Sequence, residues 1–103
     1  MCLIGDCVLI NRAASIGHHC VIDDFVSIGP GATLASNIHV GQNTVIGCGA
    51  TVLPNVRIGA GCVISGGAIV RSDVEDGMLV TPPSSKTMRF RRINSALADE
   101  DSE

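Results

Sequence analysis

Aliphatic residues recur along this chain with a period of six, without one exception or insertion. The series is Ile4, Ile10, Ile16, Ile22, Ile28, Leu34, Val40, Ile46, Val52, Ile58, Ile64 and Val70. Side chains on one face of an α-helix recur every three to four residues, and those on one face of a strand recur every second residue. A sustained period of six fits neither element alone and indicates an internal repeat.

The other positions of each six-residue unit describe a short strand followed by a tight corner. The residue after the aliphatic one is Gly in half of the units, at positions 5, 17, 29, 41, 47 and 59. We expect these glycines to permit the backbone conformations that a corner needs. The fifth position of the unit is small or slim throughout: Val8, Ala14, Cys20, Val26, Ala32, Ile38, Thr44, Ala50, Val56, Cys62, Ala68 and Val74. Each unit therefore supplies one large and one small inward side chain.

Three such units close one triangular coil, and successive coils stack as parallel strands about 4.8 Å apart. The sequence therefore predicts an all-β fold, a parallel β-helix of hexapeptide repeats. About four coils are expected, at 4–21, 22–39, 40–57 and 58–75, within a β-helix domain at 1–80. Residues one coil apart are expected to lie directly above one another.

A C-terminal tail at 81–103 follows the repeat, because the Pro-Pro pair at 82–83 ends the last short strand. Residues 84–98 place apolar residues at 88, 90, 93 and 97 among basic and small ones. This spacing permits a short amphipathic helix that could cap the end of the coil. The acidic residues at 99–103 are expected to form a solvated, disordered end.

Charge and hydropathy exclude two classes of partner. The chain of 103 residues has a net charge of −3 and no basic stripe along the coils, which argues against nucleic acid. The apolar stretch at 1–10 contains Asp6, lacks a basic start and keeps the repeat. We therefore expect it to be the first coil rather than a signal peptide or a membrane span. The open ends of the coil leave strand edges unpaired, so chains are expected to associate.

Five cysteines form an odd number without the spacing of a metal site. Cys20 and Cys62 occupy inward positions, where Cys packs as a small hydrophobe. Cys7 and Cys48 should point outward. We expect reduced thiols and a cytoplasmic protein.

Candidate chemistry is concentrated at residues 11–20, the most polar and least repetitive part of the coils. His18 lies at a corner that another subunit could approach, and a histidine reference pKa of about 6.5 suits proton transfer at neutral pH. His18 is therefore a candidate general base, although a corner histidine in a repeat protein is more often a polar turn residue. We interpret His19 as a turn residue and His39 as solvated. No metal site is expected, because two adjacent histidines cannot easily converge on one ion.

Three segments carry a resemblance that is more specific than the bare repeat. Residues 11–32 read NRAASIGHHCVIDDFVSIGPGA, residues 35–38 read ASNI and residues 49–56 read GATVLPNV. The region from Ile10 to Val70 resembles the sugar O- and N-acyltransferases of the sialic acid O-acetyltransferase type, over roughly 70 of the 103 residues. The resemblance implies a left-handed coil, a homotrimer, and acetyl-CoA bound between neighbouring β-helices.

The same resemblance implies acetyl transfer to a hydroxyl or amine of a sugar or nucleotide-linked amino sugar. His18 would be the general base, and Asn11 would orient His18 or the acceptor. Ser27, Cys48 and Gly66 would contact acetyl-CoA. A backbone N–H would stabilise the oxyanion.

Two hypotheses stay open at this point. Relatives usually carry an upstream α/β unit that binds the sugar or nucleotide, and no such unit is expected within these residues. Their closing segment also differs, and the sequence here is Thr81-Pro82-Pro83. The first hypothesis is the acetyltransferase; the second is a non-catalytic trimeric β-helix that scaffolds or binds a partner. The acceptor, and the choice between O- and N-acetylation, are left open.

Overall fold

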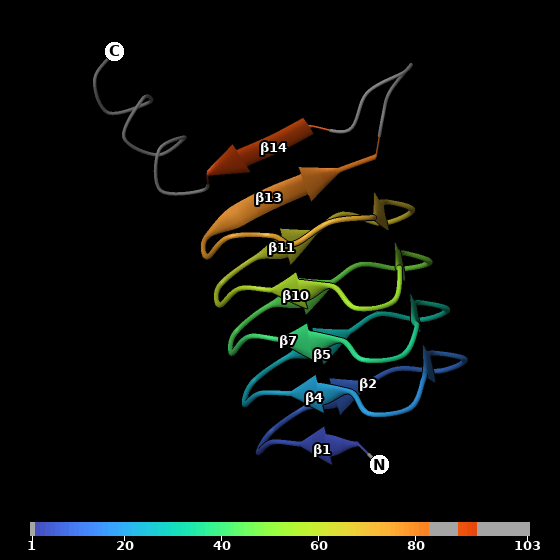
Figure 1. Ribbon diagram of the computed structural model, residues 1–103. Helices are drawn as coiled ribbons and strands as arrows, with labels where there is room; N and C mark the ends of the chain where they lie inside the picture. The colour runs from blue at the N-terminus through green and yellow to red at the C-terminus, as the bar shows by residue number, and fades with distance from the viewer. Residues whose placement is uncertain (1, 83–88, 93–103) are drawn as a thin grey trace.

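The chain forms a parallel β-helix whose coils stack along one axis (Figure 1). The computed structural model describes residues 2–82 and 89–92. In Figure 1 the front strands run leftward and the chain returns rightward behind them as it rises, which is a left-handed coil. The predicted architecture is confirmed, including this handedness.

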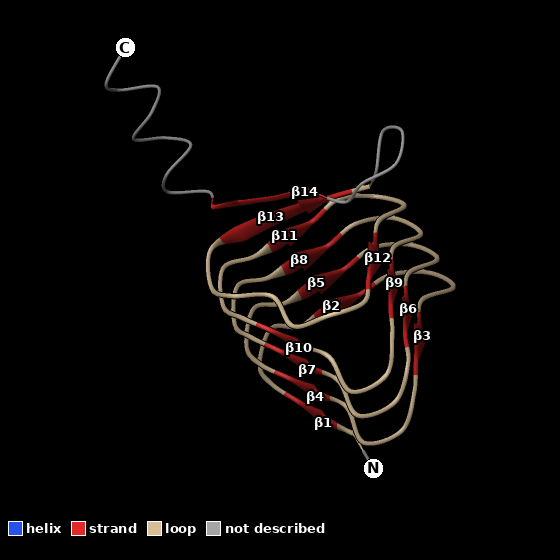
Figure 2. Cartoon of the chain, turned by 45° about the horizontal axis from the view of Figure 1, so that its top comes forward, coloured by secondary structure: helices blue, strands red, loops and turns tan. Residues whose placement is uncertain are grey.

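Each coil has a triangular section with one short strand on every side (Figure 2). The first face contains β1 (Leu3–Ile4), β4 (Val21–Ile22), β7 (His39–Val40) and β10 (Arg57–Ile58). The second face contains β2 (Leu9–Ile10), β5 (Ser27–Ile28), β8 (Val45–Ile46), β11 (Val63–Ile64), β13 (Met78–Thr81) and β14 (Arg89–Arg92). The third face contains β3 (Ser15–Ile16), β6 (Thr33–Leu34), β9 (Thr51–Val52) and β12 (Ile69–Val70).

The strands pair in parallel at a separation of 18 residues, as the period predicts; Ile4 lies beside Ile22, and Ile28 beside Ile46. The fourth coil is the exception and is two residues short. Val74 bridges Ile58 and Val80 pairs with Ile64, both at a separation of 16 residues.

The predicted full coil at 58–75 is therefore wrong at its last corner. A complete coil would place Asp76 above Ile58, in the apolar interior. Val74 takes that place instead, and the Asp73 carboxylate accepts the backbone N–H of Arg57 at 2.9 Å. The register moves because burying an aliphatic side chain is favourable and burying a carboxylate is not.

The core is one continuous column in which large and small inward side chains alternate. Thr44 is the one buried polar residue in the described part of the chain. Its hydroxyl donates to the Gly59 carbonyl at 2.7 Å and accepts the Cys62 N–H at 3.1 Å. The column therefore contains a polar group only where both of its hydrogen-bonding roles are used.

The glycines that follow the aliphatic positions have a different role from the one predicted from the sequence. Left-handed φ values recur every six residues from Cys7 to Gly67, three residues after each aliphatic position. The glycines that directly follow the aliphatic residues do not have them. A Cβ on Gly47 would instead lie 2.5 Å from the backbone N of Gly66, and a Cβ on Gly41 would lie 2.5 Å from that of Ala60. These glycines are required by the close approach of the next coil.

The C-terminal end of the column is covered by strands. β13 continues the parallel stack, and β14 pairs with it in the antiparallel direction. The predicted helix over 84–98 is therefore wrong at 89–92, because the open edge of β13 offers backbone groups that an extended segment can pair with. The rest of that predicted helix lies outside the described residues. Within the described ranges no helix has the length and apolar character to cross a membrane.

Candidate functional site

The site predicted from the sequence is divided between two corners of the coil. We call residues 11–14, 29–32, 47–50 and 65–68 the second corner, which follows the second-face strands. Residues 17–20, 35–38 and 53–56 form the third corner, which follows the third-face strands. The third face lies between these two corners. The geometry of each corner decides which predicted residues can act together.

Asn11 is half-buried at the start of the second corner. Its side-chain Nδ2 and its backbone N both donate to the carbonyl of Ile28, each at 2.9 Å. The amide is therefore fixed to the next coil. The partner of the Asn11 side chain is thus the backbone of β5 and not His18.

Ser27, Cys48 and Gly66 lie on the same side of the molecule as Asn11, one in each successive coil. Ser27 is half-buried on β5, and Cys48 is exposed on the corner of the next coil. Gly66 lies directly above Cys48: a Cβ on Gly66 would be 3.2 Å from the Cys48 carbonyl oxygen. Three coil spacings cover about 14 Å. Cys48 and Gly66 share one column, whereas Asn11 lies one residue and Ser27 three residues earlier in the repeat. We call this band of four residues, which runs along the axis beside the second corner, the axial line.

At Gly49 and Gly67 the second corner exposes backbone rather than side chains. The N–H groups of Gly49 and Gly67 donate to Pro30 and Cys48 one coil below, each at 2.9 Å. Both glycines have left-handed φ values, 67° for Gly49 and 76° for Gly67, and a Cβ on either would meet nothing within 4 Å. A thin ligand can therefore approach this corner closely. Arg12 gives the corner a positive charge at its base.

His18 is exposed at the third corner, where its position is held by the backbone. Its carbonyl accepts the N–H of Asn37, one coil above, at 2.9 Å. The adjacent His19 has a φ of 60°, the left-handed conformation expected of a turn residue. The two rings are tilted by 52° with their centroids 6.4 Å apart. His18 is thus presented outward, and His19 shapes the turn.

The structure brings Asn11, Ser27, Cys48 and Gly66 to one side of the chain but leaves His18 on another corner. The sequence interpretation grouped Asn11 with His18 because both lie in one polar run. A single coil places them on different corners, with the third face between them.

The first face carries a charged groove that the sequence interpretation missed. His39 was expected to be solvated, but its Nε2 lies 3.0 Å from the Asp23 Oδ2, and both side chains are half-buried. A cavity of about 460 Å³ lies beside this pair and extends over Arg57 and Asp73. The repeat could have indicated this groove, because its period places Arg57 one coil above His39.

The cysteines occupy the predicted positions: Cys20 and Cys62 are buried, and Cys7 and Cys48 are exposed. Burial raises the pKa of the Cys20 thiol above its ordinary value of 9.0. Its Sγ contacts the carbonyl of Ala35 at 3.1 Å. No group of three or more His, Cys, Asp or Glu side chains within the described residues could hold a metal ion.

Comparison with known sequences agrees with the repeat. Residues 37–72 match the family of the bacterial transferase hexapeptide (six repeats). Residues 37–72 thus contain the hexapeptide repeat of bacterial transferases. No curated protein sequence matches it significantly.

Solved structures that resemble the chain include acetyltransferases and an acyltransferase. A histidine mutant of perosamine N-acetyltransferase from Caulobacter crescentus, in complex with CoA and GDP-perosamine, is 30% identical with a TM-score of 0.81, over 87% of this chain and 41% of that one. The acetyltransferase domain of PglB from Neisseria gonorrhoeae, in complex with acetyl coenzyme A, is 28% identical with a TM-score of 0.71, over 82% and 50%. A UDP-N-acetylglucosamine acyltransferase is 30% identical with a TM-score of 0.82, over 95% and 37%.

These similarities confirm the resemblance to hexapeptide-repeat acyltransferases that was predicted from the sequence. The chain spans half or less of the length of each of these three proteins.

Proposed function

We propose that the chain is the acyl-donor half of an acetyl-CoA-dependent acetyltransferase that acts on a hydroxyl or amine of a sugar or nucleotide-linked amino sugar. The observation that carries this proposal is the line of Asn11, Ser27, Cys48 and Gly66 along the axis. Gly66 leaves room for a thin pantetheine arm, and the positive charge of Arg12 suits a phosphate-bearing donor. Two of the similar structures are complexes with CoA or acetyl coenzyme A, which supports the same class of donor.

His18 would complete the site from a neighbouring chain. Because the third face separates the third corner from the second in one chain, a second copy must bring its His18 to this line. The third-face strands and the repeat strands of the second face contain no charged residue. They expose Leu9, Val45 and Ile69 instead. Such surfaces suit burial between subunits, which supports a homotrimer.

In the proposed reaction, His18 takes a proton from the acceptor amine or hydroxyl. The acceptor N or O forms a bond with the acetyl carbonyl carbon as the carbon–sulfur bond breaks. The proton passes to the released CoA thiol, so the reaction needs no other reactant. Asn11, fixed to the Ile28 carbonyl, would orient the acceptor at the subunit boundary.

The base assignment is tested by His18→Ala, with His19→Asn as the matched control. Asn tolerates the left-handed conformation of residue 19, so the control keeps the turn. We expect His18→Ala to lower kcat by about 10²–10⁴-fold, the usual contribution of a general base. The control should stay within a few-fold of the wild-type chain. Release of CoA thiol across a panel of sugars and amino sugars measures both, and unchanged turnover in His18→Ala would refute the assignment.

The shared site is tested by mixing two inactive variants. Cys48→Glu places a negative charge on the axial line and should block acetyl-CoA binding. His18→Ala leaves the axial line intact and removes the base. In mixed trimers a site is active when a His18→Ala chain supplies the axial line and its Cys48→Glu neighbour supplies His18. With equal, random mixing this combination occurs at about a quarter of the sites. Recovered activity supports a site between chains, and no recovery contradicts it. A folded trimer that does not bind acetyl-CoA in calorimetry would favour the non-catalytic scaffold.

A further inference from the structure

The first-face groove is a concave site that the proposed acetyl transfer does not use. Its volume of about 460 Å³ falls within the usual range of small-molecule pockets, about 300–1,000 Å³. Its floor includes Gly41 and Gly59, which leave bare backbone between the flanking side chains.

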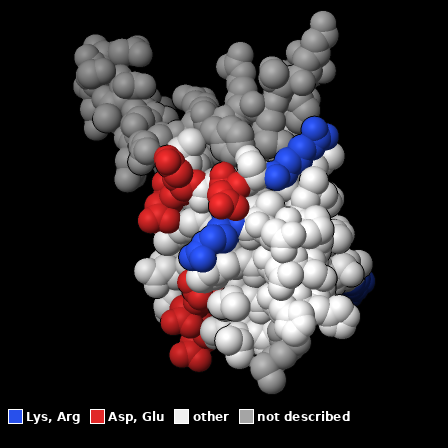
Figure 3. Space-filling view, in the orientation of Figure 1, with Lys and Arg blue, Asp and Glu red and all other residues white. Residues whose placement is uncertain are grey.

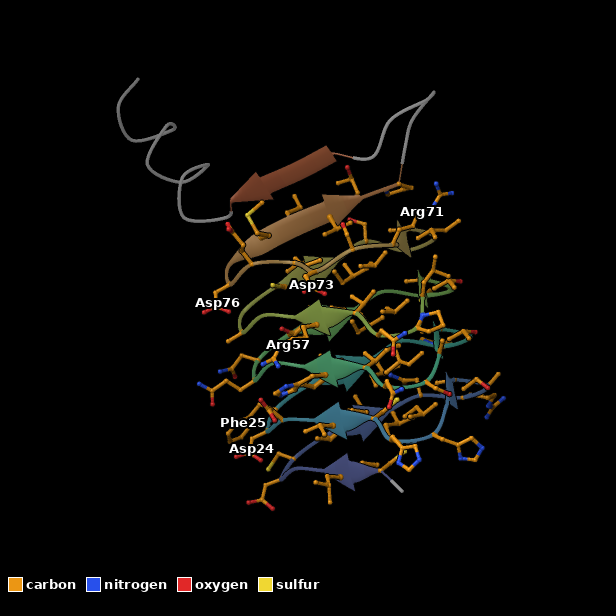
Figure 4. The ribbon with its side chains drawn as sticks, viewed as in Figure 1. Asp24, Phe25, Arg57, Arg71, Asp73 and Asp76 are labelled. Atoms are coloured by element: carbon orange, nitrogen blue, oxygen red, sulfur yellow. The ribbon has the colours of Figure 1, made fainter. Side chains whose placement is uncertain are left out.

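Charges of both signs line this groove in a fixed order. Figure 4 shows Arg57 on the first face, with Asp73 above it and Asp24 below it. Figure 3 shows the same face with basic atoms between acidic atoms above and below. The acidic residues that line the cavity itself are Asp23, Asp73, Glu75 and Asp76, and Arg57 lies between Asp23 and Asp73 in the stack. The groove therefore offers one cationic position between anionic ones.

Three of these carboxylates are held in place by contacts that leave Arg57 available. Asp73 accepts the Arg57 backbone N–H at 2.9 Å, and Asp76 accepts the Ala60 N–H at 2.8 Å. Asp23 is occupied by His39 at 3.0 Å. Within the described part of the chain, the Arg57 guanidinium forms no ion pair with any of them. The groups are thus positioned before any ligand binds, which lowers the entropic cost of binding.

The charge pattern selects among ligand classes. A phosphate-rich ligand would meet the carboxylates, and a polyamine would meet Arg57. A neutral ligand would leave the guanidinium without a charged partner. A small molecule with an ammonium group next to a carboxylate matches both signs, because guanidinium binds carboxylate through paired hydrogen bonds and carboxylates accept from ammonium.

We propose that the first-face groove binds a small zwitterion, an α-amino acid or a molecule with the same pair of groups. Arg57 binds the ligand carboxylate. The Asp23 carboxylate, which lies below Arg57 in the stack, accepts from the ligand ammonium group. This site is separate from the line of Asn11, Ser27, Cys48 and Gly66, and its ligand binds without acetyl-CoA.

The experiment is a binding screen of the twenty L-amino acids against the whole chain, without acetyl-CoA, by calorimetry and by backbone amide NMR shifts. The amino acid that binds best is then compared with its amide, which lacks the carboxylate, and with its N-acetyl form, which lacks the ammonium group. We expect shifts at 39–42 and 57–60, and at least about tenfold weaker binding of each derivative. The proposal is wrong if none of the twenty amino acids binds at millimolar concentration. It is also wrong if both derivatives bind as tightly as the amino acid itself.

Arg57→Gln should weaken binding of the amino acid by at least about tenfold and abolish the preference for the amino acid over its amide. Arg57→Lys keeps the charge but loses the paired hydrogen bonds, so its binding should be intermediate. Arg71→Gln is the matched control, because Arg71 lies away from the groove at the opposite edge of the view in Figure 4. A uniform loss in all three variants, or none in Arg57→Gln, would overturn the assignment. Since donor binding and turnover are not involved, failure here leaves the acetyltransferase proposal standing, and the reverse also holds.

Discussion

The two ends of the column have the same sequence pattern but different burial. At the N-terminal end Ile4 and Ile10 follow the repeat, yet they are 50% and 39% exposed. One coil higher, Ile22 and Ile28 are at most 1% exposed. At the C-terminal end Val80 is fully buried, where β13 and β14 continue the stack. The period thus specifies which side chains point inward, but only a neighbouring coil or strand buries them.

The difference shows how stability is distributed in a stacked fold. Each coil contacts only the coils above and below it, so an interior coil is covered twice and a terminal coil once. The C-terminal end is completed by a shortened fourth coil and by β14. The N-terminal end is not covered within the described residues, where Leu3 and Leu9 are also exposed.

The largest expected effect comes from truncating an inward isoleucine in the middle of the second face. Ile46→Ala should lower the free energy of unfolding by about 3 kcal/mol, because the lost contacts and the cavity add. Ile10→Ala, two coils lower on the same face, should cost about 1 kcal/mol or less. Urea unfolding followed by circular dichroism measures both, and equal losses would show that the N-terminal coil is covered after all.

The capped end is tested by Val80→Ala, with Ile4→Ala as its counterpart at the open end. Val80 is fully buried and Ile4 half exposed. We expect a loss of about 2 kcal/mol for Val80→Ala and less than about 1 kcal/mol for Ile4→Ala. Thermal unfolding of the two variants at one protein concentration is the measurement. A larger loss for Ile4→Ala would place a partner on the N-terminal end.

A smaller effect is expected from the polar group in the covered column. Thr44→Val keeps the shape of the side chain but leaves the Gly59 carbonyl and the Cys62 N–H without their partner. The loss should be about 1.5 kcal/mol. Thr44→Ser, which keeps the hydroxyl, should lose less. If Thr44→Val is as stable as the wild-type chain, the hydroxyl bridge contributes nothing.

The smallest effect concerns Cys2 and Cys20, which occupy the same column one coil apart. Cys2 is half-buried at the open end, whereas Cys20 is fully buried. Iodoacetamide should therefore label Cys2 well before Cys20, with peptide mass spectrometry as the readout. Equal labelling rates would indicate that the first coil opens.

The folded chain holds the Cys20 proton to higher pH than the unfolded chain, because burial raises its pKa above 9.0. The contribution of this thiol to stability is therefore complete below about pH 9 and decreases as the pH rises further.

The candidate site was only partly readable from the sequence. The repeat located Cys48 and Gly66 at outward corners and Cys20 and Cys62 inside, because inward and outward positions alternate locally along each unit. It did not show that Asn11 and His18 lie on different corners of one chain. Closeness in sequence suggested closeness in space, but one intervening strand turns the chain through a corner of the triangle.

The sequence by itself determined the strands, the inward residues and the coil, because these follow from a period that each unit carries locally. Only the tertiary structure decided how one coil meets the next. It moved Val74 above Ile58, paired His39 with Asp23, made β14 a strand, and required glycine where a Cβ would meet the adjacent coil. Each of these depends on contacts between residues 8 to 19 positions apart, and such contacts exist only once the stack has formed.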